Sequence, residues 1–330
     1  MNMEETMENN EKVVIADFVS PVEINNADEA KLKVNETREK FLEVHNKVMK
    51  KNKIASGIFF AITIAIVLIG YFVPDLMGLC FGLICAGLAF IWIFTRRQRK
   101  ELDAAVSSYL YGYSLYCNSY MYDKEDVTDL EIGYKQRPDV EVVNKLSISD
   151  EVTVINSRDL VKGKMYGLDF QAADCSLKTG NPKKESMQKA LFVGKIYMLD
   201  YSFVGEGRTF MYLKGCGDAT PTKLGDVNKI GVPGLKKDWE IYTSHKGYER
   251  IFTSDFIKVL NKIECNDTLN DVVISIVEDK VLIGFSYSDE AMIIPMNRDF
   301  ETKHLEVKKV NYNQFKAINK ALIDNTNFKK

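Results

Sequence analysis

Two long uncharged apolar runs, separated by two residues, constrain this chain more than any other feature. Residues 54–73 read IASGIFFAITIAIVLIGYFV, and residues 76–94 read LMGLCFGLICAGLAFIWIF. At a helical rise of about 1.5 Å per residue, each run is roughly 30 Å long, which is the thickness of the hydrocarbon core of a bilayer. Neither run has the polar face that a soluble helix of this length normally shows. The sequence therefore predicts a transmembrane helical hairpin.

The composition of the first run favours a membrane span over a core helix of a soluble protein. Twelve of its residues are Leu, Ile, Val or Phe. At roughly −0.3 to −0.6 kcal/mol each, these residues favour insertion by about 4 to 7 kcal/mol. The only ionisable side chains in the two runs are Tyr71 and the thiols of Cys80 and Cys85, so we do not expect an ion pathway through one copy.

Basic residues flank the two runs and predict their orientation. The link between the runs, Pro74-Asp75, contains none, whereas seven lie outside the runs: Lys50, Lys51, Lys53, Arg96, Arg97, Arg99 and Lys100. The positive-inside rule predicts a multi-pass protein of the cell (inner) membrane with both termini in the cytoplasm. The same cations would contact membrane lipids with anionic headgroups; alternatively, they only set the topology. An extracellular ligand sensor is not expected, because the hairpin leaves almost nothing outside.

Small residues recur at every fourth position in both runs. They are Gly57, Ala61 and Ala65 in the first run, and Gly78, Gly82 and Ala86 in the second. Small side chains let helix backbones approach closely in lipid. We expect these residues to pack the two helices on each other or, as an alternative, to form the face of a homo-oligomer.

Helical segments are predicted on both sides of the hairpin. Residues 29–53 and 96–123 place side chains at alternating steps of three and four residues, which is the spacing of a helical seam. The seam residues are Val34, Thr37, Phe41, Val44 and Val48 before the hairpin, and Leu102, Val106, Tyr109, Tyr113 and Tyr116 after it. We expect an antiparallel helical stalk that continues the two spans into the cytoplasm, unless the seams pack on the soluble domain.

Tyrosine is concentrated in the second of these segments, where residues 109–122 hold six tyrosines. Tyrosine supplies a large amphipathic contact area, so Tyr109, Tyr113 and Tyr116 are candidates for a partner-binding surface. Their helical spacing also allows the alternative that they are contacts within the stalk.

The remaining segments divide into a tail and a folded domain. Residues 1–28 are rich in Glu and Asn and predict an acidic, disordered tail, within which the apolar patch 13–19 could dock as a short strand.

Residues 124–330 alternate between strand and turn patterns, with strands at 164–177, 190–203 and 208–213 among others. We expect 190–203 and 208–213 to pair as a hairpin through Gly205-Glu206-Gly207. With helices at 254–263 and 311–324, the fold class is α+β: a cytosolic domain of mostly antiparallel sheet with two packed helices.

Motifs for a metal, cofactor, catalytic or nucleotide site are weak in this sequence. The chain has three histidines and six widely spaced cysteines without a CxxC pair, so we expect no metal, no cofactor and reduced cysteines. His245, Glu249 and Asp255 could form an acid/base group, but such a trio arises by chance in most chains of this size. The Gly-rich loop 214–237 lacks the P-loop motif. A net charge of −2 gives no argument for nucleic acid.

Three stretches of the chain resemble a bacterial family known as domain of unknown function 3137. They are residues 161–167 (VKGKMYG), 191–197 (LFVGKIY) and 239–256, which begins WEIYTS. The family usually has Leu-Thr-Pro where Phe252-Thr253-Ser254 stands here, and serine and proline both suit the start of a helix. The resemblance implies a membrane hairpin near the N-terminus followed by a cytosolic α+β domain. It implies no activity.

These observations favour a membrane-tethered cytosolic domain that binds another protein, as an adaptor or assembly factor, over an enzyme. The alternative is a ligand-binding or enzymatic domain that acts on a membrane-proximal substrate and uses the loop 214–237. A third possibility is a hairpin that gathers membrane proteins through Gly78 and Gly82.

Overall fold

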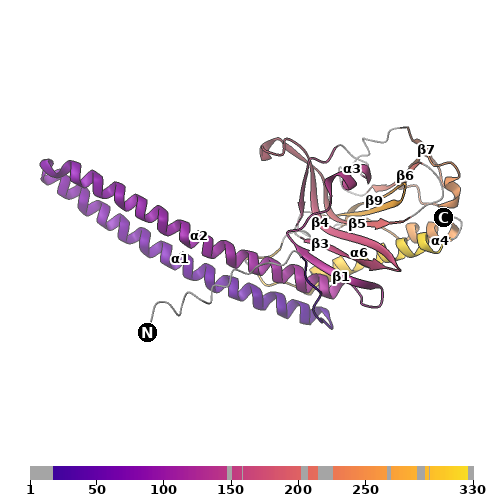
Figure 1. Cartoon of the computed structure of the whole chain (residues 1–330), viewed down its shortest axis with the longest axis horizontal. Helices are drawn as coiled ribbons and strands as arrows, with labels where there is room; N and C mark the ends of the chain where they lie inside the picture. The colour runs from indigo at the N-terminus through magenta and orange to yellow at the C-terminus, as the bar shows by residue number, and fades with distance from the viewer. Residues whose placement is uncertain are drawn as a thin grey trace. The chain divides into compact units, whose positions relative to one another are not determined.

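The computed structural model describes residues 18–146, 151–157, 159–201, 207–214, 226–265, 269–287, 294–296 and 298–325. The contacts divide the chain into two compact units (Figure 1). The helical unit is Leu32–Tyr113, and the sheet domain combines Ser114–Lys330 with the segment that precedes residue 32. The helix that ends at Met121 therefore contributes its last two turns to the sheet domain, and the sheet domain begins earlier than residue 124.

Two long helices form most of the helical unit. Helix α1 covers Ala27–Phe72 and helix α2 covers Met77–Met121, with a single 3-10 turn, Pro74–Leu76, between them. Asn26 starts α1, because its Oδ1 accepts a hydrogen bond from the backbone N–H of Glu29 at 2.9 Å. Proline suits the first position of the turn, where no backbone donor is needed. Each predicted span thus shares one helix with the charged segment beside it.

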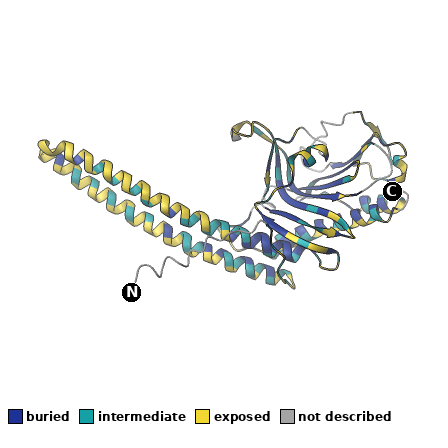
Figure 2. Ribbon diagram, viewed as in Figure 1, coloured by how far each residue is buried: buried dark blue, intermediate teal, exposed yellow. Residues whose placement is uncertain are grey.

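The apolar stretches of α1 and α2 satisfy the length and composition of membrane spans. Each contains an 18-residue window with a mean hydropathy of 2.4, and most of each window is exposed (Figure 2). Exposed apolar surface of this extent is unfavourable in water and favourable in lipid. The two helices therefore fit a membrane-associated protein, as the sequence predicted.

The two helices pair in antiparallel fashion along a seam. The rings of Phe41 and Tyr109 stack with centroids 5.9 Å apart, and Gly112 lies against Thr37. On α1 the buried side chains include Val34, Phe41 and Val48, which are spaced by seven residues as in a coiled coil. The antiparallel helix pair expected from the two seams is present.

The small residues that recur every fourth position do not form this contact, and the expectation that they pack the two helices together is wrong. A Cβ atom placed on Gly57, Gly78 or Gly82 would have no atom within 4 Å. The remaining members of the set are also exposed: Ala61, Ala65 and Ala86. Close approach occurs instead where Gly87 meets Phe59 and Gly70 meets Cys80. Gly57 precedes Phe59 by two residues, so it points about 160° away from the pairing face. A homo-oligomer face remains a prediction.

Among the described residues, the sheet domain contains one ten-stranded sheet in which every pair of strands is antiparallel. Its order is β1-β3-β4-β5-β10-β9-β6-β8-β7, and β2 pairs with β4. The strands are β1 Val127–Tyr134, β2 Val154–Ser157, β3 Asp159–Met165, β4 Leu168–Gly180, β5 Gln188–Asp200, β6 Arg208–Lys214, β7 Asn228–Ile230, β8 Trp239–Thr243, β9 Leu269–Val277 and β10 Lys280–Tyr287. The mixed α+β class with a mostly antiparallel sheet is confirmed.

Strand pairing differs from the sequence expectation in two places. The expected hairpin of 190–203 with 208–213 is wrong, because β10 and β9 lie between β5 and β6. A turn signal reports only a local change of direction, whereas the partner of a strand is chosen by contacts distant in sequence. The single strand expected at 164–177 is divided at Tyr166-Gly167, where both residues have positive φ, as a two-residue hairpin turn requires.

Helices cover both faces of the sheet. On one face lie α4 (Ser254–Asn261), α6 (Thr302–Ile323) and the last turns of α2, and Tyr197 of β5 stacks on Phe315 of α6 with centroids 4.0 Å apart. On the other face lies α3 (Val140–Leu146), which was not predicted from the sequence and which packs into a cluster of buried apolar side chains. Thr253, and not Ser254, caps α4, because its side chain accepts the N–H of Phe256. Helix α6 begins nine residues before the expected position. Single 3-10 turns lie at Glu185–Met187 and Tyr248–Arg250.

The segment before α1 lies along the edge of the sheet. Val19 forms a two-way backbone pair with Ile132 of β1, the edge strand, at 2.9 and 2.8 Å. The ammonium of Lys162 lies 4.4 Å from the ring centroid of Phe18. The end of the apolar patch 13–19 thus docks as a single bridge, and residues 13–17 of that patch lie outside the described residues. The sequence also predicts an edge strand at 291–296; residues 291–293 lie outside the described residues, and residues 294–296 are not in a strand.

We predict that Gly87→Leu destabilises the helix pair. A Cβ at this position would lie 2.7 Å from Cε2 of Phe59, and overpacking of this kind costs about 1 to 3 kcal/mol. Thermal unfolding of the full-length protein in detergent, followed by circular dichroism, should show a lower melting temperature. Gly82→Leu is the matched control, because the space beside Gly82 is open. Equal melting temperatures for both variants would contradict this pairing of the helices.

Candidate functional site

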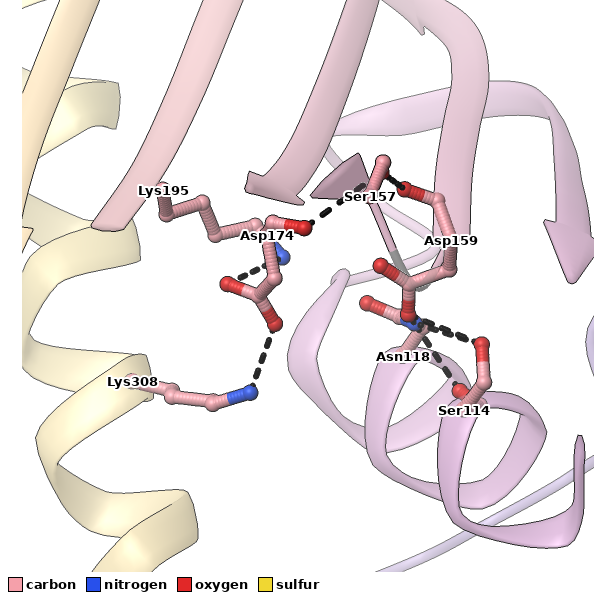
Figure 3. Close-up of polar contacts among 7 residues, drawn as sticks. All are labelled: Ser114, Asn118, Ser157, Asp159, Asp174, Lys195 and Lys308. Carbon is pink, nitrogen blue, oxygen red and sulfur yellow. Dashed lines mark hydrogen bonds and ion pairs between the residues drawn. The ribbon is translucent and has the colours of Figure 1, made fainter. Parts of the chain in front are cut away.

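Charged side chains meet in the buried layer between the sheet and its covering helices. Asp174 of β4 and Lys195 of β5 stand directly opposite each other in the strand register, and Lys308 reaches them from α6 (Figure 3). The ammonium of Lys308 donates to Oδ2 of Asp174 at 2.7 Å, and the ammonium of Lys195 lies 3.9 Å from Oδ1. One carboxylate therefore joins two strands and a helix.

A second carboxylate, Asp159 of β3, attaches the end of α2 to the same face. Ser114 donates its hydroxyl to Oδ2 of Asp159 at 2.8 Å, and Asn118 donates its amide to the same oxygen at 2.6 Å (Figure 3). Ser114 and Asn118 are four residues apart and so share one side of the helix. Ser157 donates to the backbone carbonyl of Asp159 at 2.8 Å. This part of the network binds the last turns of α2 to the sheet.

The network is almost fully excluded from solvent. Lys195 is 0% exposed, and Asp159, Asp174 and Lys308 are at most 6% exposed. Burial lowers the pKa of Lys195, and the charge of Asp174 opposes that shift. The rings of Tyr122 and Tyr197, at 5.6 and 5.9 Å from its ammonium, give further compensation. Two carboxylates and two ammonium groups make the set neutral, as the cost of burying charge requires.

Thiols near the network are not activated. Burial raises the pKa of Cys117, on α2, to about 12, and burial also raises the pKa of Cys175, beside Asp174. A thiol in this state is a poor nucleophile. The buried network is therefore suited to holding α2, α6 and the sheet together, since a substrate has no open path to its charged atoms.

Where α2 ends, half-exposed lysines of α6 also attach this helix to the sheet domain. Lys309 of α6 donates to the carbonyl of Met121 at 2.9 Å and to Oδ1 of Asp123 at 2.6 Å. Lys316, two turns further along the same face of α6, pairs with Asp123 and Asp126. Burial opposes ionisation of Asp123, but the hydrogen bonds and charges of the two lysines outweigh it and lower its pKa. Cations at the C-terminus of α2 also suit the helix dipole.

An accessible cleft lies at one end of the sheet, on the side of α3. Its volume is about 510 Å³, and it is bordered by charged side chains from five strands and the start of α3. The acidic ones are Asp129, Glu131, Asp139, Asp169 and Asp200, and the basic ones are Lys162, Lys164 and Lys280. Two ion pairs order its rim, Lys280 with Asp200 at 2.6 Å and Lys164 with Asp129 at 3.6 Å. This cleft is the candidate binding site of the sheet domain.

The candidate partner tyrosines occupy different environments. Tyr109 and Tyr113 are buried, and Tyr109 stacks on Phe41, so the stalk-contact interpretation accounts for Tyr109. Tyr116 is partly exposed. A partner surface made of all three side chains does not exist in this arrangement, because two of them are covered.

The acid/base trio does not form a recognisable site. His245 is buried, its Nδ1 lies 2.8 Å from Oγ1 of Thr209, and burial lowers its pKa. Asp255 is exposed and pairs with Lys258 at 3.0 Å, and Glu249 is exposed. The contact of His245 is structural, whereas the ion pair of Asp255 is exposed and contributes little to stability. No group of three or more His, Cys, Asp or Glu side chains suited to a metal occurs among the described residues.

The Gly-rich loop 214–237 is described only in part. Residues 215–225 lie outside the described residues, and the segment 226–237 contains β7, which pairs with β8 at the end of the sheet. The cleft of the sheet domain is bordered by other residues. A site under this loop stays a prediction.

Neither the buried network nor the cleft was predicted from the sequence. The signal that was available is a lone charge within an apolar strand: Asp174 in AADCS and Lys195 in VGKIY. Charges are almost never fully buried unless they are paired, so two such positions could have been proposed as partners. The residues of the cleft carry no comparable signal, because isolated charges on strands are common on solvent-facing positions.

We predict that Asp174→Ala strongly destabilises the sheet domain. The variant leaves two buried ammonium groups without their carboxylate, and breaking a buried pair in this way costs about 3 to 5 kcal/mol. Chemical denaturation of the full-length protein in detergent should show a lower midpoint, and the added change Lys195→Met should restore part of the loss. The exposed carboxylate Asp255 supplies the control, since Asp255→Ala should leave the midpoint unchanged. An Asp174→Ala variant as stable as this control would refute the role of the network.

Comparison with known proteins adds little to this geometry. No protein-family model matches the chain, and no curated protein does. One solved structure that aligns with it is the mycobacterial trehalose monomycolate transport factor A, at 12% identity and a TM-score of 0.30, over 53% of this chain and 76% of that chain. A TM-score this low supports no conclusion about fold or function, so the candidate site stands on its own residues.

Proposed function

We propose that this chain is an integral membrane protein that crosses the bilayer twice through α1 and α2, with both termini in the cytoplasm. We further propose that its sheet domain is a binding domain, an adaptor or assembly factor tethered to the inner face of the membrane. The resemblance to domain of unknown function 3137 agrees with this architecture and is part of the proposal.

The membrane part of the proposal is supported by the two exposed apolar helices and by the charges beside them. Both helices are long enough to cross a bilayer, and the link at Pro74–Leu76 carries only the charge of Asp75. Seven lysine and arginine residues lie at the opposite ends of the two spans. Basic residues are retained on the cytoplasmic side.

The binding function is supported by one observation, the charged cleft of the sheet domain. Five carboxylates and three lysines border it, and most of these side chains are exposed, including Glu131, Asp139 and Asp169. Pockets for small ligands are lined mainly by apolar and aromatic side chains, whereas the rims of protein interfaces are polar. The excess of carboxylates favours a partner protein that presents a basic segment.

A ligand-binding or enzymatic role is the second candidate. The cleft volume of about 510 Å³ falls within the range of small-molecule sites, roughly 300 to 1,000 Å³. A cationic small molecule near the membrane surface would then occupy the cleft, beside Met198.

We predict that Asp75→Cys becomes accessible only from the outer side of the membrane. A membrane-impermeant maleimide added to intact cells should label this variant, whereas Glu23→Cys should be labelled only after the cells are opened. The native chain measures the background from its own six cysteines. Labelling of Glu23→Cys in intact cells would overturn the proposed topology.

We predict that reversing two charges of the cleft releases the partner. The full-length protein purified in mild detergent should carry a stoichiometric protein, identified by mass spectrometry, and Glu131→Lys with Asp169→Lys should reduce its yield at least tenfold. The matched control reverses two exposed acids elsewhere, Asp255→Lys and Glu264→Lys, and should retain the partner. Equal retention by both variants would remove the cleft as the site, and a small molecule that co-purifies and is lost only from the cleft variant would favour the second candidate.

A further inference from the structure

We propose that a groove between α1 and α2 binds the headgroup of an anionic phospholipid. The groove has a volume of about 610 Å³ and lies wholly within the helical unit. The residues used in the argument are Asn52 of α1 and Trp92, Arg96, Arg99, Lys100 and Asp103 of α2. This inference rests on the proposed membrane crossing, and it adds a ligand and a site to it.

The groove lies where the apolar spans give way to charge. Asn52 precedes the first apolar run by two residues, Trp92 lies in the last turn of the second run, and Arg96 follows that run by two residues. Tryptophan is enriched at the membrane–water interface, where headgroups lie. In a bilayer that covers the two apolar runs, the groove would open at the level of the lipid phosphates.

The charge of the groove complements an anionic headgroup. Arg96, Arg99 and Lys100 contribute three positive charges, and Asp103 contributes one negative charge. The guanidinium of Arg96 lies 5.4 Å from the ring centroid of Trp92, which restrains the arginine at the interface. Arginine binds phosphate oxygens through two parallel hydrogen bonds. A phosphate in the groove would therefore find both net positive charge and a fork of donors.

Asn52, which borders the groove, carries an acceptor that could take part in a second interaction. Oδ1 of Asn52 is buried and has no hydrogen-bond partner among the described residues. Leaving a buried acceptor unsatisfied is unfavourable, so a donor supplied from outside would be favourable. Phosphatidylglycerol carries both an anionic phosphate and hydroxyl donors, and we therefore commit to it as the probe.

The other cations at this level of the helices supply a matched control. Lys50, Lys51 and Lys53 carry the same charge as Arg96, Arg99 and Lys100 and are exposed, but they do not border the groove. Attraction of a cation to an anionic surface amounts to about 1 kcal/mol, which is roughly fivefold in affinity. This general attraction is shared by the two sets, so any difference between them reports the groove itself.

The test is a titration of the detergent-solubilised full-length protein with dioleoylphosphatidylglycerol, followed by native mass spectrometry. The dissociation constant of the first bound lipid should rise at least tenfold more in the Arg96→Gln/Arg99→Gln/Lys100→Gln variant than in the Lys50→Gln/Lys51→Gln/Lys53→Gln variant. Thr95→Trp, which fills the groove and keeps every cation, should also weaken binding, and it replaces the first variant if that one fails to fold. Dioleoylphosphatidylcholine should bind at least tenfold more weakly than phosphatidylglycerol.

Four results would overturn the proposal: equal weakening in the two triple variants, unchanged binding in Thr95→Trp, equal affinity for phosphatidylcholine, or displacement of the lipid by millimolar sodium phosphate. The last result would identify free phosphate, and not lipid, as the occupant. Because the titration is carried out in micelles, it does not depend on membrane topology or on the partner of the cleft. Its failure is thus distinct from failure of the maleimide or co-purification experiments.

Discussion

Both compact units depend on helix α2. Its single uninterrupted backbone contains an exposed apolar stretch, a stretch that pairs with α1 and an end that is buried in the sheet domain. Its first half, from Met77, is apolar and exposed as a membrane span requires. Its middle pairs with α1 through Tyr109 and Gly112. Its last two turns, from Ser114 to Met121, are buried in the sheet domain. A helix whose hydrogen bonds are all internal can pass from lipid to water to a protein core without exposing unsatisfied backbone groups.

The attachment of α2 to the sheet relies on hydrogen bonds and charge as well as on apolar contact. Asp159 accepts two hydrogen bonds from the helix, and Asp174 binds ammonium groups from β5 and α6. Such interactions are directional, so they favour one register of helix on sheet where apolar packing alone would permit several. The half-exposed lysines that bind Asp123 and Asp126 extend this restraint to the turn that follows α2. The accessible cleft, by contrast, lies on the opposite face of the sheet, where α3 covers only part of the surface. The buried network and the cleft that we propose as a binding site therefore lie on different faces of the sheet.

Local patterns in the sequence predicted much of this architecture. Apolar length predicted the two long apolar helices, and steps of three and four residues predicted the antiparallel pair around Phe41 and Tyr109. Alternation with turn signals predicted an antiparallel sheet with helices near residues 254 and 311. Features that depend on pairing were missed. The pattern at Gly57 and Gly82 resembled a packing motif, but the contact uses Gly87 and Gly70. The turn at Gly205-Glu206-Gly207 resembled a hairpin, but β9 and β10 pair between the two strands. The cleft could not be predicted from local patterns either, because its charged side chains come from five strands that only the fold brings together.

The sequence by itself determined the chemical character of each segment. It specified two long apolar stretches with basic residues beside them, amphipathic helices and alternating strands. These follow from side-chain periodicity and hydropathy, which are properties of neighbouring residues. The tertiary structure alone decided which strands are neighbours, which glycines meet a partner helix and where Asp174 and Lys195 are placed. The reason is physical: these outcomes depend on free energies of contacts between residues far apart in the chain, including burial of charge that is tolerated only when the opposite charge arrives from another element.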